Sequence, residues 1–222
     1  MKFVRSLLAI SLFCACGTVA QAEYSVEVLK EPAPADAVSA EIAAALSKTG
    51  LRISEDGEAV YDIWLRDTWP VKDGFKPTLQ ILYPFQMGDL LGVIRLAKRT
   101  EDFRQQQLRS GVYTMRYFQQ PVDGNHVGTS DTLDFFLLSK ASEDEKLAPP
   151  DKADLFANSA NAARSSHPAM LSMVPSSSKE APAMRFQDDT EWWVLSVSNK
   201  TKAGDKEGKL TIDFVVAGHA LE

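Results

Sequence analysis

Apolar and polar residues alternate in short runs along most of this chain, and a period of two predicts β-strands. The run VYDIWLR at residues 60–66 places an apolar face with Tyr61 and Ile63 opposite a mixed face with Asp62 and Trp64. Alternating or short apolar runs predict strands at residues 24–29, 51–53, 60–66, 88–96, 112–118, 133–138, 167–174, 183–187, 191–198 and 209–217. Because Gly, Pro and Asp turns separate these runs, we expect antiparallel pairing.

A helical period replaces the alternation in two places. Residues 38, 42, 45 and 46 form one apolar stripe of a short helix that begins after Asp36 and ends at Thr49 and Gly50. A second helix is expected over residues 151–164, with Asp151 as its N-cap. About eight to ten strands with two short helices predict an all-β fold with minor α content, namely an antiparallel β-sandwich. We expect one domain over residues 23–222.

The N-terminal segment has the pattern of a secretory signal peptide. Lys2 and Arg5 precede an apolar stretch, and the small residues Ala20 and Ala22 form an A-x-A cleavage site, so residues 1–22 are expected to be removed. The protein is therefore expected to be periplasmic or extracellular, with no transmembrane span in the mature chain. A lipid anchor at Cys16 is a less favoured alternative, because Phe13 and Cys14 fit a lipid-attachment motif poorly.

The signal peptide also changes the charge and the cysteine content. Both cysteines of the chain, Cys14 and Cys16, lie inside it, so a disulfide framework in the mature chain is not expected. Without Lys2 and Arg5, 22 basic residues stand against 30 acidic ones, a net charge of −8. This charge disfavours binding to nucleic acid and to anionic membrane surfaces, and it leaves an unknown envelope or extracellular ligand as the expected partner.

Residues 110–139 read as strand, irregular loop and strand, and they carry a resemblance. The motifs are GVYTMRY at 111–117, Pro121, DGNH at 123–126, DFFLL at 134–138 and SHPAMLS at 166–172. With these motifs the chain resembles a family of secreted bacterial β-rich proteins that carry a domain of unknown function. SGVY at 110–113, EWWVL at 191–195 and SNK at 198–200 are similar to another group of secreted β-sandwich domains. The resemblance implies export and a β-rich fold, and it implies no catalytic residues.

A metal site is one hypothesis for the chemistry of this loop. His126, His167 and a carboxylate such as Asp131 or Asp123 are suitable ligands for zinc or copper, and such a site could serve a metal-dependent hydrolase. The alternative is that His126 bonds within its own turn and that His167 caps the end of the second helix. Local H-x-H and H-E-x-x-H motifs are absent from the sequence, so the spacing does not require a metal.

Aromatic residues give a second hypothesis, which is ligand binding. Trp192 and Trp64 each lie on a strand face that also carries polar residues, and exposed tryptophans suit stacking against a sugar or a peptide. The alternative is that a helix covers these faces and that both tryptophans belong to the core. Asp123 and Asn125 are further candidates for ligand binding. With Asp131 they could supply oxygen atoms to calcium, although the loop does not have the order of an EF-hand, and the alternative is that they are ordinary turn residues.

The sequence contains no G-x-S-x-G motif, and the mature chain has no cysteine, so nucleophilic hydrolysis lacks a signal. We therefore expect an exported, non-enzymatic β-sandwich protein without a cofactor, with a ligand-binding or structural role at the cell envelope. The alternative is a zinc- or copper-binding protein that uses His126 and His167.

Overall fold

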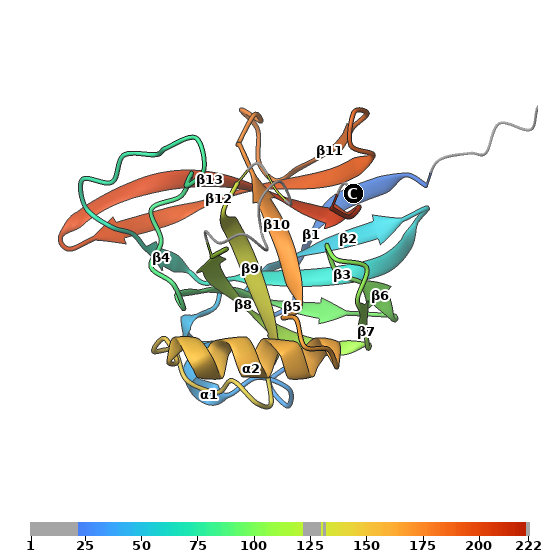
Figure 1. Cartoon of the computed structure of the whole chain (residues 1–222), viewed down its shortest axis with the longest axis horizontal. Helices are drawn as coiled ribbons and strands as arrows, with labels where there is room; N and C mark the ends of the chain where they lie inside the picture. Colours follow the sequence, from blue (N-terminus) through green and yellow to red (C-terminus); the bar gives the residue numbers. More distant parts are fainter. Residues whose placement is uncertain (1–21, 122–129, 131, 221–222) are drawn as a thin grey trace, which may run out of the picture.

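The computed structural model describes residues 22–121, 130 and 132–220. Its strands are β1 (Tyr24–Leu29), β2 (Gly50–Glu55), β3 (Glu58–Leu65), β4 (Thr68–Pro70), β5 (Leu90–Leu96), β6 (Thr100–Glu101), β7 (Gln107–Leu108), β8 (Gly111–Gln119), β9 (Asp134–Lys140), β10 (Met170–Val174), β11 (Ala183–Gln187), β12 (Trp192–Ala203) and β13 (Lys206–Ala217). The helices are α1 (Ala40–Ala45) and α2 (Lys152–Ala163). The fold is therefore all-β with minor α content, as predicted (Figure 1).

The strands form a two-layered antiparallel sandwich whose layers are joined at β10. The order is β1-β2-β3-β5-β8-β9-β10-β13-β12-β11, and β4 adds to β12 in parallel. The first half of β10 pairs with β9, whereas Met173 and Val174 pair with β13. The chain therefore turns from the first layer into the second within one strand (Figure 1).

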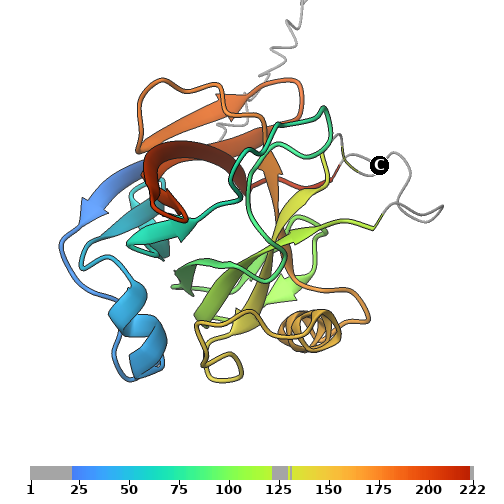
Figure 2. The same ribbon diagram turned by 90° about the vertical axis from the view of Figure 1, so that its left-hand side faces the viewer.

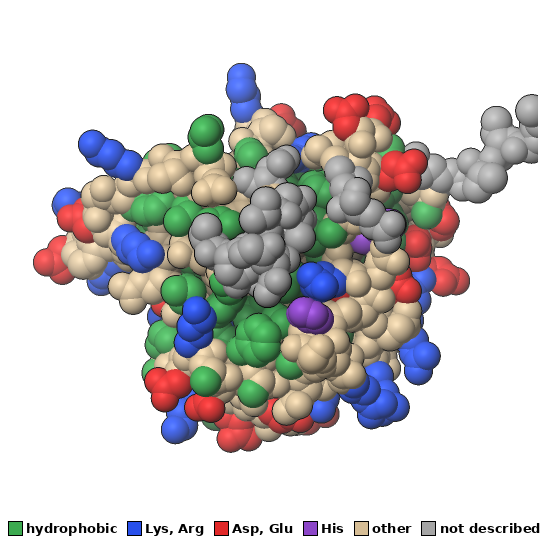
Figure 3. Space-filling view, in the orientation of Figure 1, with side chains coloured by type: hydrophobic (Ala, Val, Ile, Leu, Met, Phe, Trp, Pro, Cys, Tyr) green, Lys and Arg blue, Asp and Glu red, His purple; other side chains and the backbone are tan. Residues whose placement is uncertain are grey.

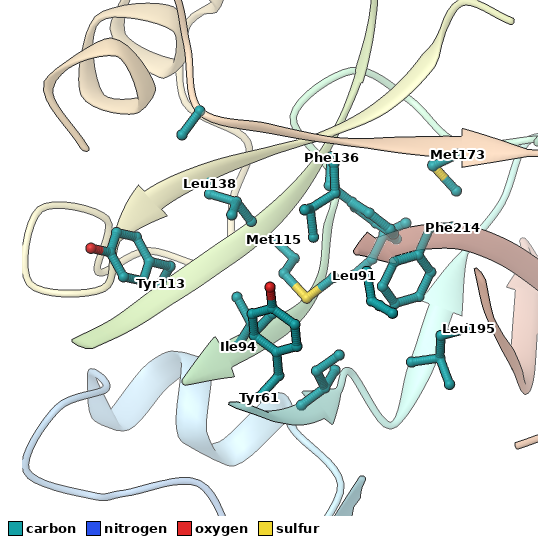
Figure 4. Packing of buried hydrophobic residues seen from close by; sticks show 14 of the residues in the cluster. Tyr61, Leu91, Ile94, Tyr113, Met115, Phe136, Leu138, Met173, Leu195 and Phe214 are labelled. Atoms are coloured by element: carbon teal, nitrogen blue, oxygen red, sulfur yellow. The ribbon is translucent and has the colours of Figure 1, made fainter. Parts of the chain in front are cut away.

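The main core fills the space between the two layers. Alternate residues of the strands point into it, so β3 supplies Tyr61 and Ile63, and β13 supplies Ile212 and Phe214. Phe136 of β9 meets Phe214 edge to face, with ring centroids 5.1 Å apart (Figure 4). The inward faces that the alternation predicted for residues 60–66 and 209–217 are confirmed.

Both helices lie on the outer face of the first layer (Figures 1 and 2). Leu155 of α2 packs on Phe118 and Leu137, and Ile42 and Leu46 of the α1 region pack on the outer face of β3 and β5. Neither helix in the described part of the chain is long and apolar enough to cross a membrane.

The first helix is shorter than predicted. Its N-cap is Ser39, whose hydroxyl accepts a hydrogen bond from the Ile42 N–H, and not Asp36. Leu46 is already extended, because it forms a bridge with Arg66. Gly50 opens β2 instead of ending the helix, and a Cβ there would lie 2.8 Å from Nε1 of Trp64. Strand pairing at Leu46 therefore ends the helix earlier than the apolar stripe suggests.

The last hairpin is longer than predicted. The predicted strands at residues 191–198 and 209–217 leave residues 199–208 as a loop, but β12 and β13 pair as far as Ala203 and Lys206. The turn between them contains Gly204 at φ 59° and Asp205, a residue pair that suits a two-residue hairpin. The residues in the outer part of the hairpin are mostly polar, so this part shows no alternation of apolar and polar residues that would predict a strand.

Candidate functional site

Trp64 belongs to the core, so the ligand-binding interpretation is wrong for this residue, and the alternative that its strand face is covered is confirmed. Its side chain is 1% exposed, and its Nε1–H donates a hydrogen bond of 2.7 Å to the Glu31 carbonyl. The polar residue on the same face, Asp62, is also buried, and its carboxylate pairs with Arg52 and Arg95. The α1 region covers a face that sequence alternation alone marked as mixed.

The structure describes only one of the candidate metal ligands, His167. Asp123, Asn125, His126 and Asp131 lie outside the described residues. His167 is exposed, and its main-chain N–H donates to the Ser165 hydroxyl at 3.2 Å. Within residues 22–121, 130 and 132–220, no three His, Cys, Asp or Glu side chains are placed to share a metal ion. The site of His126, His167 and Asp131 therefore stays a prediction.

Trp192 lies on the outer face of the second layer, as the alternation predicted, and it is half-buried. Its Nε1–H donates to the His219 carbonyl at 2.8 Å, and its ring meets Phe103 edge to face at 5.2 Å. A Cβ on Gly218 would lie 2.5 Å from Cδ1 of Trp192, so the C-terminal segment packs closely against the indole. These contacts hold the ring in one orientation.

Trp192 lines a cavity of about 370 Å³. The polar side chains around this cavity are Ser130, Thr132, Ser172, Ser177, Arg185 and Gln187. They converge because side chains on neighbouring strands share a face: Arg185 is opposite Val194, and Gln187 is opposite Trp192. Ser172 points to the outer face of β10, since Leu171 and Met173 on either side point into the core.

The guanidinium of Arg185, which lines the cavity, pairs with the buried carboxylate of Asp213. Nη2 of Arg185 lies 3.3 Å from Oδ2 of Asp213, which is fully buried. Asp213 also accepts hydrogen bonds from the Ser176 hydroxyl at 3.0 Å and the Ser177 N–H at 3.2 Å. The guanidinium is therefore fixed at one edge, and the pair has no net charge.

Tyr83 supports Asp213 from the core side. Its hydroxyl accepts a hydrogen bond from the Asp213 N–H at 3.1 Å and donates one to the Val174 carbonyl at 2.6 Å. Burial raises the pKa of Tyr83 well above its usual value, so the hydroxyl keeps its proton at neutral pH. This chain of contacts ties β10, β13 and the Tyr83 segment together beneath the cavity.

Two residues of the cavity lining, Arg185 and Ser172, each carry a polar atom with unused bonding capacity. Nη1 of Arg185 and Oγ of Ser172 are buried, and neither has a hydrogen-bond partner among the described residues. A buried donor without a partner costs about 1–3 kcal/mol, so such groups are uncommon unless something else binds them. A guanidinium with one free edge suits a carboxylate or another polar acceptor.

Sequence reasoning identified Trp192 but missed Arg185 and Ser172. Both lie in segments that were correctly predicted as extended, and neither belongs to a chemical motif. A basic residue at the centre of the run AMRFQ was the one available signal.

Comparison with protein-family models, with curated proteins and with solved structures finds no match for this chain. The resemblance to secreted β-rich bacterial proteins therefore stays a prediction.

Proposed function

We propose that this chain is an exported binding protein and that the cavity beside Trp192 holds a small, ring-shaped polar ligand with a carboxylate, such as a sugar acid. The observation that carries the proposal is that Arg185 and Ser172 line the same cavity, and that Nη1 of Arg185 and Oγ of Ser172 have no hydrogen-bond partner among the described residues. A carboxylate would give the guanidinium its missing acceptor, and a sugar ring would stack on the indole.

The cavity is suited to binding more than to catalysis. Its volume is within the range of small-molecule sites, and its polar lining among the described residues consists of hydroxyl, amide and guanidinium groups. Asp213, the carboxylate that contacts Arg185 of the lining, is fully buried and also accepts hydrogen bonds from Ser176 and Ser177. This supports the non-enzymatic role that the absence of sequence motifs favours.

Export is proposed from the sequence pattern of residues 1–22, with the envelope or the extracellular space as the place of action. Mass spectrometry of the protein secreted from its host cell tests this directly. A mature chain that starts at Glu23 supports export with cleavage, whereas an intact N-terminus in the cytoplasm contradicts it. A diacylated Cys16 would show the lipid-anchored alternative instead.

Calorimetric titration of the mature chain with D-glucuronate and D-glucose tests the ligand class. We expect glucuronate to bind about tenfold or more tightly than glucose, because hydrogen bonds to charged groups contribute about 1.5–3 kcal/mol. Equal affinities, or no binding of either sugar at millimolar concentration, would contradict the proposal.

Arg185→Met should abolish the preference for glucuronate, and Arg99→Met is the matched control, since Arg99 is exposed and outside the cavity. Because Arg185→Met leaves Asp213 without its cation, Ser172→Ala provides a milder test that keeps the ion pair. It should weaken glucuronate binding several-fold with unchanged thermal stability. Unchanged affinity in both variants would refute the assignment.

A further inference from the structure

A second, apolar cavity of about 190 Å³ lies between α2 and the outer face of β9 and β10. Its apolar lining consists of Phe118, Pro121, Phe135, Leu137, Phe156, Pro168 and Met170. Phe156 is 39% exposed although it is a large aromatic residue in the middle of α2. Its neighbour Leu155, by contrast, is buried against the sheet. Phe156 therefore forms an apolar wall at the mouth of the cavity, and this wall remains partly exposed to solvent.

Basic side chains border this apolar surface. Arg104 and His167 belong to the lining and are exposed, and the ammonium group of Lys152 lies 5.6 Å from the ring centroid of Phe118. Figure 3 shows hydrophobic side chains gathered on this face, with basic side chains and a histidine beside them. Neither Arg104 nor Lys152 forms an ion pair with another residue in the described ranges.

We propose that this cavity binds the alkyl chain of a medium-chain fatty acid, with its carboxylate at Arg104 and the neighbouring cations. The apolar interior suits a hydrocarbon tail, and the Arg104 guanidinium in the lining suits one anionic head group. A purely apolar ligand would give Arg104 and Lys152 no anionic partner. A purely polar ligand would leave the phenylalanines of the lining without apolar contacts.

This site is independent of the cavity beside Trp192. The two share no lining residue, and Phe103 lies between them. Phe103 is 3% exposed, and its ring contacts Phe135 of the apolar cavity at 6.3 Å and Trp192 at 5.2 Å. The proposal therefore does not rest on the proposed sugar-acid site, and a fatty acid should bind equally well to the Arg185→Met variant.

Calorimetric titration of the mature chain with hexanoate and octanoate below their critical micelle concentrations, and with octanol below its solubility limit, tests the proposal. Each added methylene should strengthen binding about fourfold, the factor that corresponds to about 0.8 kcal/mol for a buried CH₂. Octanoate should bind at least fivefold more tightly than octanol. Equal affinity for the acid and the alcohol, or an affinity that does not depend on chain length, would overturn the proposal.

Two surface variants locate the binding site. Phe156→Ser removes the exposed wall and should weaken octanoate about tenfold, whereas Met87→Ser removes an apolar side chain of similar exposure (45%) elsewhere and should change nothing. Arg104→Ala should weaken octanoate but leave octanol unchanged. Unchanged octanoate affinity in both the Phe156 and Arg104 variants would show that any binding occurs at another place.

Discussion

Replacement of Trp64 by alanine should destabilise the protein strongly. The side chain is 1% exposed, its Nε1–H donates to the Glu31 carbonyl, and the Arg95 guanidinium lies 5.6 Å from its ring centroid. Truncation of a buried aromatic residue costs about 3–5 kcal/mol. For a domain of this size that loss lowers the melting temperature by about 6–20 °C. It would remove a large share of a typical folding free energy of about 5–15 kcal/mol.

Urea unfolding followed by far-ultraviolet circular dichroism measures this loss. Trp64→Phe is the matched variant, because it keeps most of the packing and loses the hydrogen bond to Glu31. It should cost about 1–3 kcal/mol. Trp192→Ala should cost less than Trp64→Ala, since Trp192 is only half-buried. A loss below about 1 kcal/mol for Trp64→Ala would refute the reasoning and would restore the ligand-binding interpretation for this residue.

Two further predictions concern buried ion pairs. Asp144→Asn should lower the free energy of unfolding by about 3–5 kcal/mol. The reason is that the fully buried Arg116 would lose its carboxylate, which accepts from Nε at 2.6 Å and from Nη2 at 2.8 Å. Urea titration measures this, and a loss below about 1 kcal/mol would contradict it. Burial raises the pKa of Asp62, but hydrogen bonds from Arg52 and Arg95 outweigh burial and hold that pKa below its ordinary value. The carboxylate therefore stabilises the fold above about pH 4, the ordinary range of an aspartate, and this contribution disappears as the pH falls through the lowered pKa. The difference in melting temperature between wild type and Asp62→Asn should shrink from pH 6 to pH 3, and a constant difference would exclude this linkage.

Strand identity was largely readable from the sequence, because the direction of alternate side chains follows from backbone geometry alone. Tyr61 and Ile63 in β3 and Phe214 in β13 point inward, as their spacing predicted. The second helix was also predicted closely, from Asp151 to its end at Arg164. These features depend on residues that are close together along the chain.

Element ends were less predictable, because long-range pairing decided them. The bridge between Leu46 and Arg66 ends α1 early, and the proximity of Trp64 to Gly50 depends on the pairing of β2 with β3. The polar outer part of the last hairpin gave no apolar signal, yet β12 and β13 remain paired there. In each case the deciding contact joins residues that are distant in the sequence.

The hydrophobic pattern alone determined that this chain forms many short strands with two faces each, and the N-terminal pattern alone predicts export. Only the tertiary structure decided which of those faces are covered. It buried Trp64 beneath the α1 region and left Trp192 beside a cavity. It also brought Ser172 and Arg185 together from β10 and β11, strands that are separated by β13 and β12 in the sheet order. Alternation specifies the side on which a residue lies, whereas the packing of distant segments determines what it meets there.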